Sequence, residues 1–269
     1  MQTIKDAKRI VFKVGTSTLT HPTMKPNLRR MQQLAAVLTD LHNAGREVIL
    51  VSSGAIAVGC SKLGVPRPKT TQGKQAVSSV GQLELMFLYD RVFGDYGATV
   101  AQLLLTGDDV DIKERRTNLM NCLTKLLEMD AIPIINENDS VSIEEVEFGD
   151  NDGLSAIVAK LVGADALVIL TDTDGLYTGN PAEDENAVLI PYVKKLTDEI
   201  MSLGGGSGTK RGTGGMKTKL DAAKRATDAG IDTVILNGSY PENIYQVMEG
   251  RSLGTFICGQ PCADIKPHN

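Results

Sequence analysis

Short apolar runs alternate along this chain with longer stretches in which apolar residues recur every three or four positions. The short runs are rich in valine, isoleucine and leucine, and each is followed by a polar residue or a glycine. This pattern predicts strands that are buried on both faces of a sheet. The predicted strands cover residues 9–14, 47–51, 98–105, 131–135, 166–170 and 233–236.

The longer stretches predict helices between these strands. One apolar face begins at Leu28 and continues at helical spacing to Leu41, and Gly45 supplies a stop signal. Strands that alternate with helices of this length form parallel βαβ units, so we expect an α/β fold with a mainly parallel sheet. The other predicted helices cover residues 55–63, 75–93, 112–129, 155–162 and 216–229.

Two stretches interrupt this alternation. Residues 141–148 alternate apolar and acidic side chains, which is typical of a small hairpin. Residues 204–215 hold seven glycines in twelve positions and lead into a lysine-rich helix start. The second stretch is either a flexible linker or a loop that binds phosphate.

Composition narrows the class of protein. The chain has 269 residues, enough for one large α/β domain or two small ones, and 42% are hydrophobic. A net charge of -5 argues against a nucleic-acid-binding protein. We see neither an apolar run long enough to span a bilayer nor an apolar N-terminal signal region, so we expect a cytoplasmic protein without membrane contact.

The richest polar cluster follows the predicted strand 131–135. Asn136 to Asp139 are all amides or carboxylates, and Asp150 to Asp152 precede the next helix. Asp150 or Asp152 is a candidate helix N-cap, but a cap explains one residue rather than the whole group. Such a cluster suits a substrate ammonium group, a metal-bound phosphate or a neighbouring cationic side chain.

Two lysines stand beside glycines at the ends of predicted elements. Lys13 and Gly15 close the first strand, where open α/β sheets bind their ligands. Lys219 follows the glycines at 212–215 and lies in the first turns of a helix, whose free amides favour phosphate. The spacing of a Walker A motif is absent from the segment around Lys13.

Two further strand ends carry polar groups. Ser53 and Gly54 lie between a strand and a helix, where Ser53 caps the helix or the backbone amides receive an anion. Without a Gly-x-Ser-x-Gly motif or a suitable histidine, this serine does not indicate a hydrolase. Thr171 and Asp172 begin an Asp-Gly turn that forms either a plain turn or a nucleoside contact.

All these groups lie at strand-to-helix junctions or at a helix start, so they meet along one edge of a parallel sheet. Two lysines, glycine-rich turns and a carboxylate cluster suit phosphoryl transfer, which needs mainly positioning and charge neutralisation. Cys258 and Cys262 lie close to His268, but a metal site needs more ligands, so we expect none there.

Eight segments, in order across the chain, resemble the amino acid kinase family and, within it, the branch that phosphorylates glutamate. The resemblance implies a single three-layer αβα sandwich over residues 1–269. It also implies that ATP and magnesium (Mg2+) support phosphorylation of the glutamate side-chain carboxylate, a step of proline synthesis. The segments are residues 11–17, 51–57, 81–82, 135–139, 149–152, 170–172, 175–177 and 212–216.

The resemblance also implies a role for each motif residue. Lys13 and Lys219 would stabilise the transferring phosphoryl group, and Asp152 would hold both lysines. Glutamate would contact Ser53, Gly54, Asp139 and Asn151. Magnesium would lie mainly on the nucleotide phosphates, with no dedicated metal-binding residues. ATP would contact Lys13, Gly15, Thr171, Asp172, Thr213, Gly214, Gly215, Met216 and Lys219.

Further expectations rest on the same resemblance. Many bacterial members carry a C-terminal PUA domain, whereas this chain ends soon after Phe256, so we expect the kinase domain alone. Members of this kind are often inhibited by proline, form homo-oligomers and are coupled to a glutamyl phosphate reductase. Two alternatives are another family member, such as an acetylglutamate kinase, and a non-catalytic amino-acid or nucleotide sensor. The two lysines disfavour the sensor.

Overall fold

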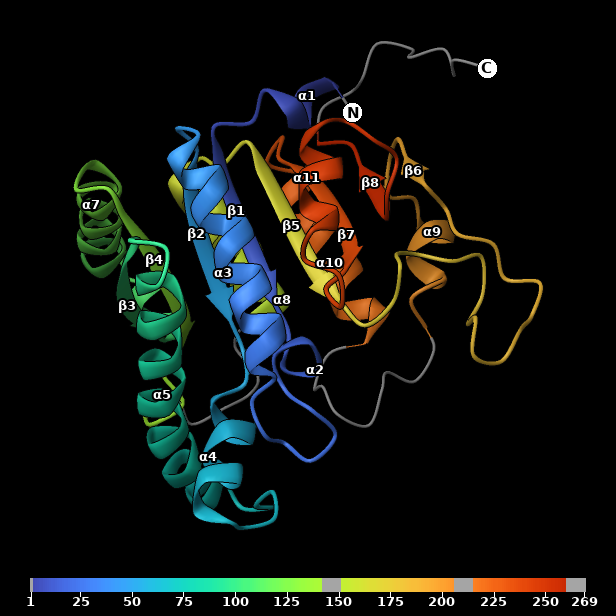
Figure 1. The fold of residues 1–269 in the computed structure, drawn as a ribbon. Helices are drawn as coiled ribbons and strands as arrows, with labels where there is room; N and C mark the ends of the chain where they lie inside the picture. The colour runs from blue at the N-terminus through green and yellow to red at the C-terminus, as the bar shows by residue number, and fades with distance from the viewer. Residues whose placement is uncertain (1, 142–150, 206–214, 260–269) are drawn as a thin grey trace.

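The computed structural model describes residues 2–141, 151–205 and 215–259. Its centre is an eight-stranded sheet in the order β3-β4-β2-β1-β5-β7-β8-β6 (Figure 1). The strands are β1 (Arg9–Val14), β2 (Glu47–Ser52), β3 (Thr99–Leu105), β4 (Ala131–Glu137), β5 (Ala166–Thr171), β6 (Tyr192–Val193), β7 (Asp232–Asn237) and β8 (Thr255–Ile257).

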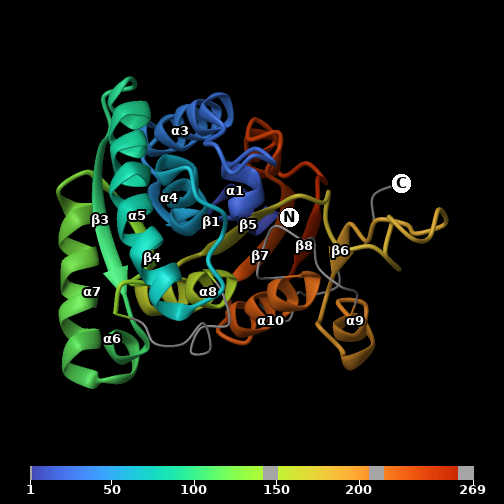
Figure 2. The same cartoon turned by 90° about the horizontal axis from the view of Figure 1, so that it is seen from below.

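Helices cover both faces of this sheet, and none within the described residues is long and apolar enough to cross a membrane (Figure 2). They are α1 (Gln2–Lys5), α2 (Thr16–Leu19), α3 (Leu28–Asn43), α4 (Ala55–Leu63), α5 (Thr71–Gly94), α6 (Gly107–Asp111), α7 (Lys113–Glu128), α8 (Asn151–Val162), α9 (Asp198–Ser202), α10 (Met216–Thr227) and α11 (Asn243–Met248).

The apolar strands are buried on both sides, as their sequence predicts. In β1, Phe12 belongs to a core cluster with residues of α3, α5 and α11, whereas Val11 belongs to a second cluster with residues of α7, α8 and α10. Because successive strand side chains point to opposite faces, a central strand needs an apolar residue at nearly every position. The three-layer α/β arrangement with a mainly parallel sheet is therefore confirmed.

Several details differ from the sequence-based expectations. β8 runs antiparallel to β7, and both β8 and β6 are too short to give an alternating pattern. Leu28 begins α3 but is 52% exposed, so it does not belong to the buried face. The expected hairpin at 141–148 lies almost entirely outside the described residues.

α4 and α5 are held together by two glycines in close backbone contact. A Cβ atom at Gly59 would lie 1.9 Å from the carbonyl oxygen of Val77, and one at Gly81 would lie 1.8 Å from that of Ala55. Only glycine allows two helices to approach this closely. The contact fixes the N-terminal half of α5 beside the carboxyl ends of the parallel strands (Figure 1).

We expect Gly81→Ala to lower the free energy of unfolding by about 1–3 kcal/mol or more, because the new methyl group overlaps backbone atoms that have no free volume. Gly94→Ala is the matched control: it lies at the end of the same helix, and its Cβ would meet nothing within 4 Å. Denaturant unfolding of both variants measures the difference. Equal stability of the two would show that α4 and α5 adjust easily.

Candidate functional site

The parallel strands all end at one edge of the sheet, which Figure 2 views from below. Polar side chains gather there although most of the surrounding residues are apolar. The carboxyl ends of β1, β2 and β4 and the first turns of α8 and α10 supply them. The buried members include Lys13, Ser52, Asn136, Asp152 and Lys219.

Two lysines share one buried carboxylate at this edge. Asp152 is fully buried, its Oδ1 lies 2.5 Å from Nζ of Lys13, and its Oδ2 lies 3.2 Å from Nζ of Lys219. The three residues come from α8, the end of β1 and the first turns of α10. Two ammonium groups and one carboxylate leave a formal charge of +1, which suits an anionic ligand. We call these three residues the lysine cluster.

Neighbouring groups complete the lysine cluster. Thr218 donates its hydroxyl to Oδ2 of Asp152 at 2.8 Å, which adds a third contact to that carboxylate. A Cβ atom at Gly15 would lie 3.7 Å from Nζ of Lys13, so the backbone of Gly15 passes close to the ammonium group. Asp152 is the second residue of α8 rather than its N-cap, so the proposed capping role for it is wrong.

A network of amides and hydroxyls lies beside the lysine cluster. Asn151 donates through Nδ2 to Oγ of Ser53 at 2.9 Å and to Oδ1 of Asn136 at 2.9 Å. Asn136 in turn donates to Oε1 of Gln82 at 2.9 Å. The hydroxyls of Ser52 and Tyr89 lie 2.8 Å apart, and burial raises the pKa of Tyr89 above its ordinary value, so the phenol stays protonated. We call these six residues the amide network.

The start of α8 joins the two groups. Asn151 belongs to the amide network, and Asp152, the next residue, belongs to the lysine cluster. Ser53 accepts from Asn151, whereas the N-cap of α4 is Gly54 with a φ of 107°, so the capping role considered for Ser53 is wrong. Gly54 occupies a left-handed conformation that disfavours other residues, and no side chain caps the first amides of α4.

The structure shows where Asn136 and Asp139 lie relative to the end of β4. β4 continues to Glu137, so Asn136 is a buried strand residue rather than a loop residue. Asp139 follows the strand, is half-buried and accepts a hydrogen bond from the hydroxyl of Ser78 at 2.5 Å. The sequence did not single out Ser78 or Tyr89, which lie within a long helix and belong to no recognisable motif.

A third polar group lies at the ends of β5 and β7. Thr171 is buried, and its backbone carbonyl accepts from the amide of Gly238 at 2.7 Å. Asn237 donates to Oδ1 of Asp174 at 2.7 Å, while Asp172 is exposed. These contacts join the ends of the two strands, and both strands contact α10.

The first turn of α10 faces the lysine cluster. Gly215 is its N-cap without a side-chain cap, and its carbonyl oxygen lies 3.4 Å from Nζ of Lys219. Met216 is partly buried against the small core formed by β8 and α10. Thr213 and Gly214 lie outside the described residues, as do Asp150, Cys262 and His268.

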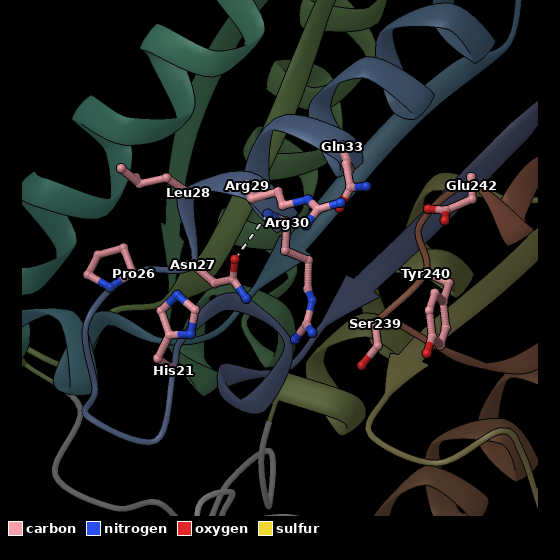
Figure 3. A pocket seen from close by; sticks show the side chains of 10 residues that line it. All are labelled: His21, Pro26, Asn27, Leu28, Arg29, Arg30, Gln33, Ser239, Tyr240 and Glu242. Carbon is pink, nitrogen blue, oxygen red and sulfur yellow. Dashed lines mark hydrogen bonds between the residues drawn. The ribbon is translucent and has the colours of Figure 1, made fainter.

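A separate cavity of about 590 Å³ opens between the start of α3 and the loop after β7. Figure 3 shows Arg30 in its middle, with His21 and Asn27 on one side and Ser239 and Tyr240 on the other. Arg30 also donates to the carbonyl of Thr18 at 3.1 Å and so supports α2. The lysines and Asp152 do not line this cavity, so we place the chemistry at the lysine cluster.

Comparisons with known proteins agree with this geometry. Residues 8–237 match the amino acid kinase family. A glutamate 5-kinase of Listeria monocytogenes serovar 1/2a is 51% identical over 264 residues, which covers 96% of each chain. A glutamate 5-kinase of Clostridium perfringens is 49% identical over 94% of this chain and 96% of its own.

Solved structures with low sequence identity share the fold. A UMP kinase from Bacillus anthracis superposes with a TM-score of 0.65 at 15% identity, covering 97% of this chain and 99% of its own. An isopentenyl phosphate kinase from T. acidophilum gives a TM-score of 0.64 at 17% identity, covering 93% and 99%. At such identities the likeness concerns the fold alone.

Proposed function

Because the chain belongs to the amino acid kinase family, we propose that it transfers the γ-phosphoryl group of ATP to the side-chain carboxylate of glutamate. The products are glutamyl 5-phosphate and ADP, and the reaction is the first step of proline biosynthesis. The lysine cluster carries this proposal, because two buried ammonium groups on one carboxylate leave a positive charge where phosphate must react. Relatives with about half of their residues identical carry the same activity in their names.

The lysines supply what the reaction lacks. The attacking carboxylate oxygen forms a bond to the γ-phosphorus while the bond to the β-γ bridging oxygen breaks and ADP leaves. A glutamate side chain has a pKa of about 4.3 in water, so it is already ionised near neutral pH and needs no strong general base. Two anions must approach each other, and Lys13 and Lys219 reduce their repulsion.

Glutamate fits the groups beside the lysine cluster. Asp139 offers a carboxylate to the substrate ammonium group. Asn151, which is adjacent to Asp152, and its hydrogen-bond partner Ser53 offer further polar contacts. The backbone amides after Gly54 suit the substrate carboxylate, because free amides at a helix start favour anions. This arrangement directs the side-chain carboxylate toward the lysines.

We place ATP over the ends of β5 and β7 and the first turn of α10. Thr171, Asp172, Gly215 and Met216 would contact the nucleotide there, with Lys13, Gly15 and Lys219 at the phosphates. No group of three acidic, histidine or cysteine residues within the described ranges suits a metal ion, and Asp152 is held by the lysines. Magnesium would bind to the ATP phosphates, where it would neutralise part of their negative charge.

Incubation with ATP, magnesium and glutamate, followed by trapping of the acyl phosphate with hydroxylamine, tests the activity. We expect glutamate-dependent hydroxamate and little product from N-acetylglutamate, because acetylation removes the ammonium charge that Asp139 would face. Product from N-acetylglutamate alone would favour the alternative family member. Binding of either ligand without turnover would favour a sensor.

We further propose a cytoplasmic location, homo-oligomers, inhibition by proline and functional coupling to a glutamyl phosphate reductase. An acyl phosphate hydrolyses in water, so direct transfer to the reductase would reduce the loss of this product. Light scattering of the purified protein and activity measured with added proline test the second and third points.

A further inference from the structure

α5 carries a stripe of three buried polar side chains on its otherwise apolar inner face. Ser78, Gln82 and Tyr89 lie one turn and then two turns apart, so they share one side of the helix. Ser78 donates to Asp139, Gln82 accepts from Asn136, and Tyr89 contacts Ser52. Each member of the stripe therefore contacts a different group on the substrate side of the site.

Backbone groups fix which way Asn136 points. Its Oδ1 accepts the backbone amide of Glu137 at 2.9 Å, and a backbone amide can only donate. The Nδ2 of Asn136 must therefore face the opposite side and find an acceptor there. Oε1 of Gln82, at 2.9 Å, is that acceptor.

The same reasoning fixes Asn151. Its Nδ2 lies 3.1 Å from the carbonyl oxygen of Ser52, which can only accept, and 2.9 Å from Oδ1 of Asn136. Oδ1 of Asn151 is consequently turned away from both partners. It is buried and has no hydrogen-bond partner within the described part of the chain. A buried acceptor without a donor is unfavourable, so this atom is prepared to receive a donor from a ligand.

We infer, on the basis of the proposed function, that Gln82 is a positioning residue for glutamate. It does not contact the substrate. By accepting from Asn136 it holds the orientation of that amide, and Asn136 in turn holds Asn151 with Oδ1 free for the substrate ammonium group. Ser78 acts in the same way on Asp139 through the hydrogen bond to Oδ2.

Gln82→Met tests this inference, because methionine has a similar size and removes the acceptor. Without it, Nδ2 of Asn136 is buried and unpaired, so the amide shifts and releases Asn151. We expect the KM for glutamate to rise about ten-fold while the KM for ATP stays within about two-fold. Gln82→Glu keeps an acceptor oxygen and should restore a KM for glutamate close to that of the unaltered protein.

Two further variants complete the experiment. Ser78→Ala removes a single oxygen and should also raise the KM for glutamate and not that for ATP. This variant decides the matter if Gln82→Met fails to fold. Glu84→Gln is the control, because Glu84 lies on α5 but pairs with Lys62 of α4, away from the stripe, and should leave both constants unchanged.

The outcomes separate this inference from the proposed function. An unaltered protein that forms no glutamate-dependent acyl phosphate refutes the function itself. If the unaltered protein is active, an unchanged KM for glutamate in both Gln82→Met and Ser78→Ala overturns the positioning role. Equal rises in the KM for glutamate and the KM for ATP would also overturn the positioning role, because they indicate a general distortion of the site. An equal effect of Gln82→Met and Gln82→Glu would overturn it for the same reason.

Discussion

Lys219→Ala and Lys13→Ala should each reduce kcat by about 10²–10³-fold, the range seen when one charge-stabilising donor is removed from an active site. Both ammonium groups lie against Asp152 and complete a cluster whose net charge is positive. Removing one lysine takes away compensation that the transition state needs. Steady-state hydroxamate formation with saturating ATP and glutamate measures the loss.

Stability should change little in these two variants. After loss of either lysine, Asp152 still pairs with the other one, so no buried charge is left alone. Lys224→Ala is the matched control on α10, because that lysine is exposed and pairs with Asp228. Rates near those of the unaltered protein in Lys13→Ala or Lys219→Ala would remove these residues from the chemistry.

Unlike the two lysine variants, Asp152→Asn should lose much of its stability as well as its activity. The substitution removes the buried carboxylate charge that both ammonium groups share. Breaking a buried ion pair in this way lowers the free energy of unfolding by about 3–5 kcal/mol. Thermal or denaturant unfolding of Asp152→Asn beside the two lysine variants measures the contrast.

ATP provides a second test of the same cluster. The phosphates of ATP supply negative charge, so saturating ATP should recover part of the stability lost in Asp152→Asn. The unfolding midpoint of this variant should rise more with ATP than that of the unaltered protein. Asp228→Asn is the control, because that carboxylate is exposed and pairs only with Lys224 among the described contacts. Equal stability of Asp152→Asn and the unaltered protein would contradict the buried-charge argument.

Much of the fold was predictable because its central strands are buried on both faces. β1 and β5 have apolar residues at nearly every position, and their predicted bounds differ from the observed ones by no more than a residue. β6 and β8 were missed, since two or three residues carry no periodic signal. Their pairing depends on contacts between segments that are distant in sequence.

The sequence by itself determined the central strands of the sheet and the strand ends at which polar residues collect. Its motifs, which include Lys13, Asp152 and Lys219, also indicated the family. The resemblance implies that Asp152 holds both lysines, but only the tertiary structure gave these contacts and the hydrogen bond from Asn136 to Gln82 of α5. The physical reason is that strand burial is encoded locally, in the spacing of apolar residues. Hydrogen-bond partners depend on which helix packs against which strand end. The polar residues of a long helix do not reveal in the sequence which strand they will contact.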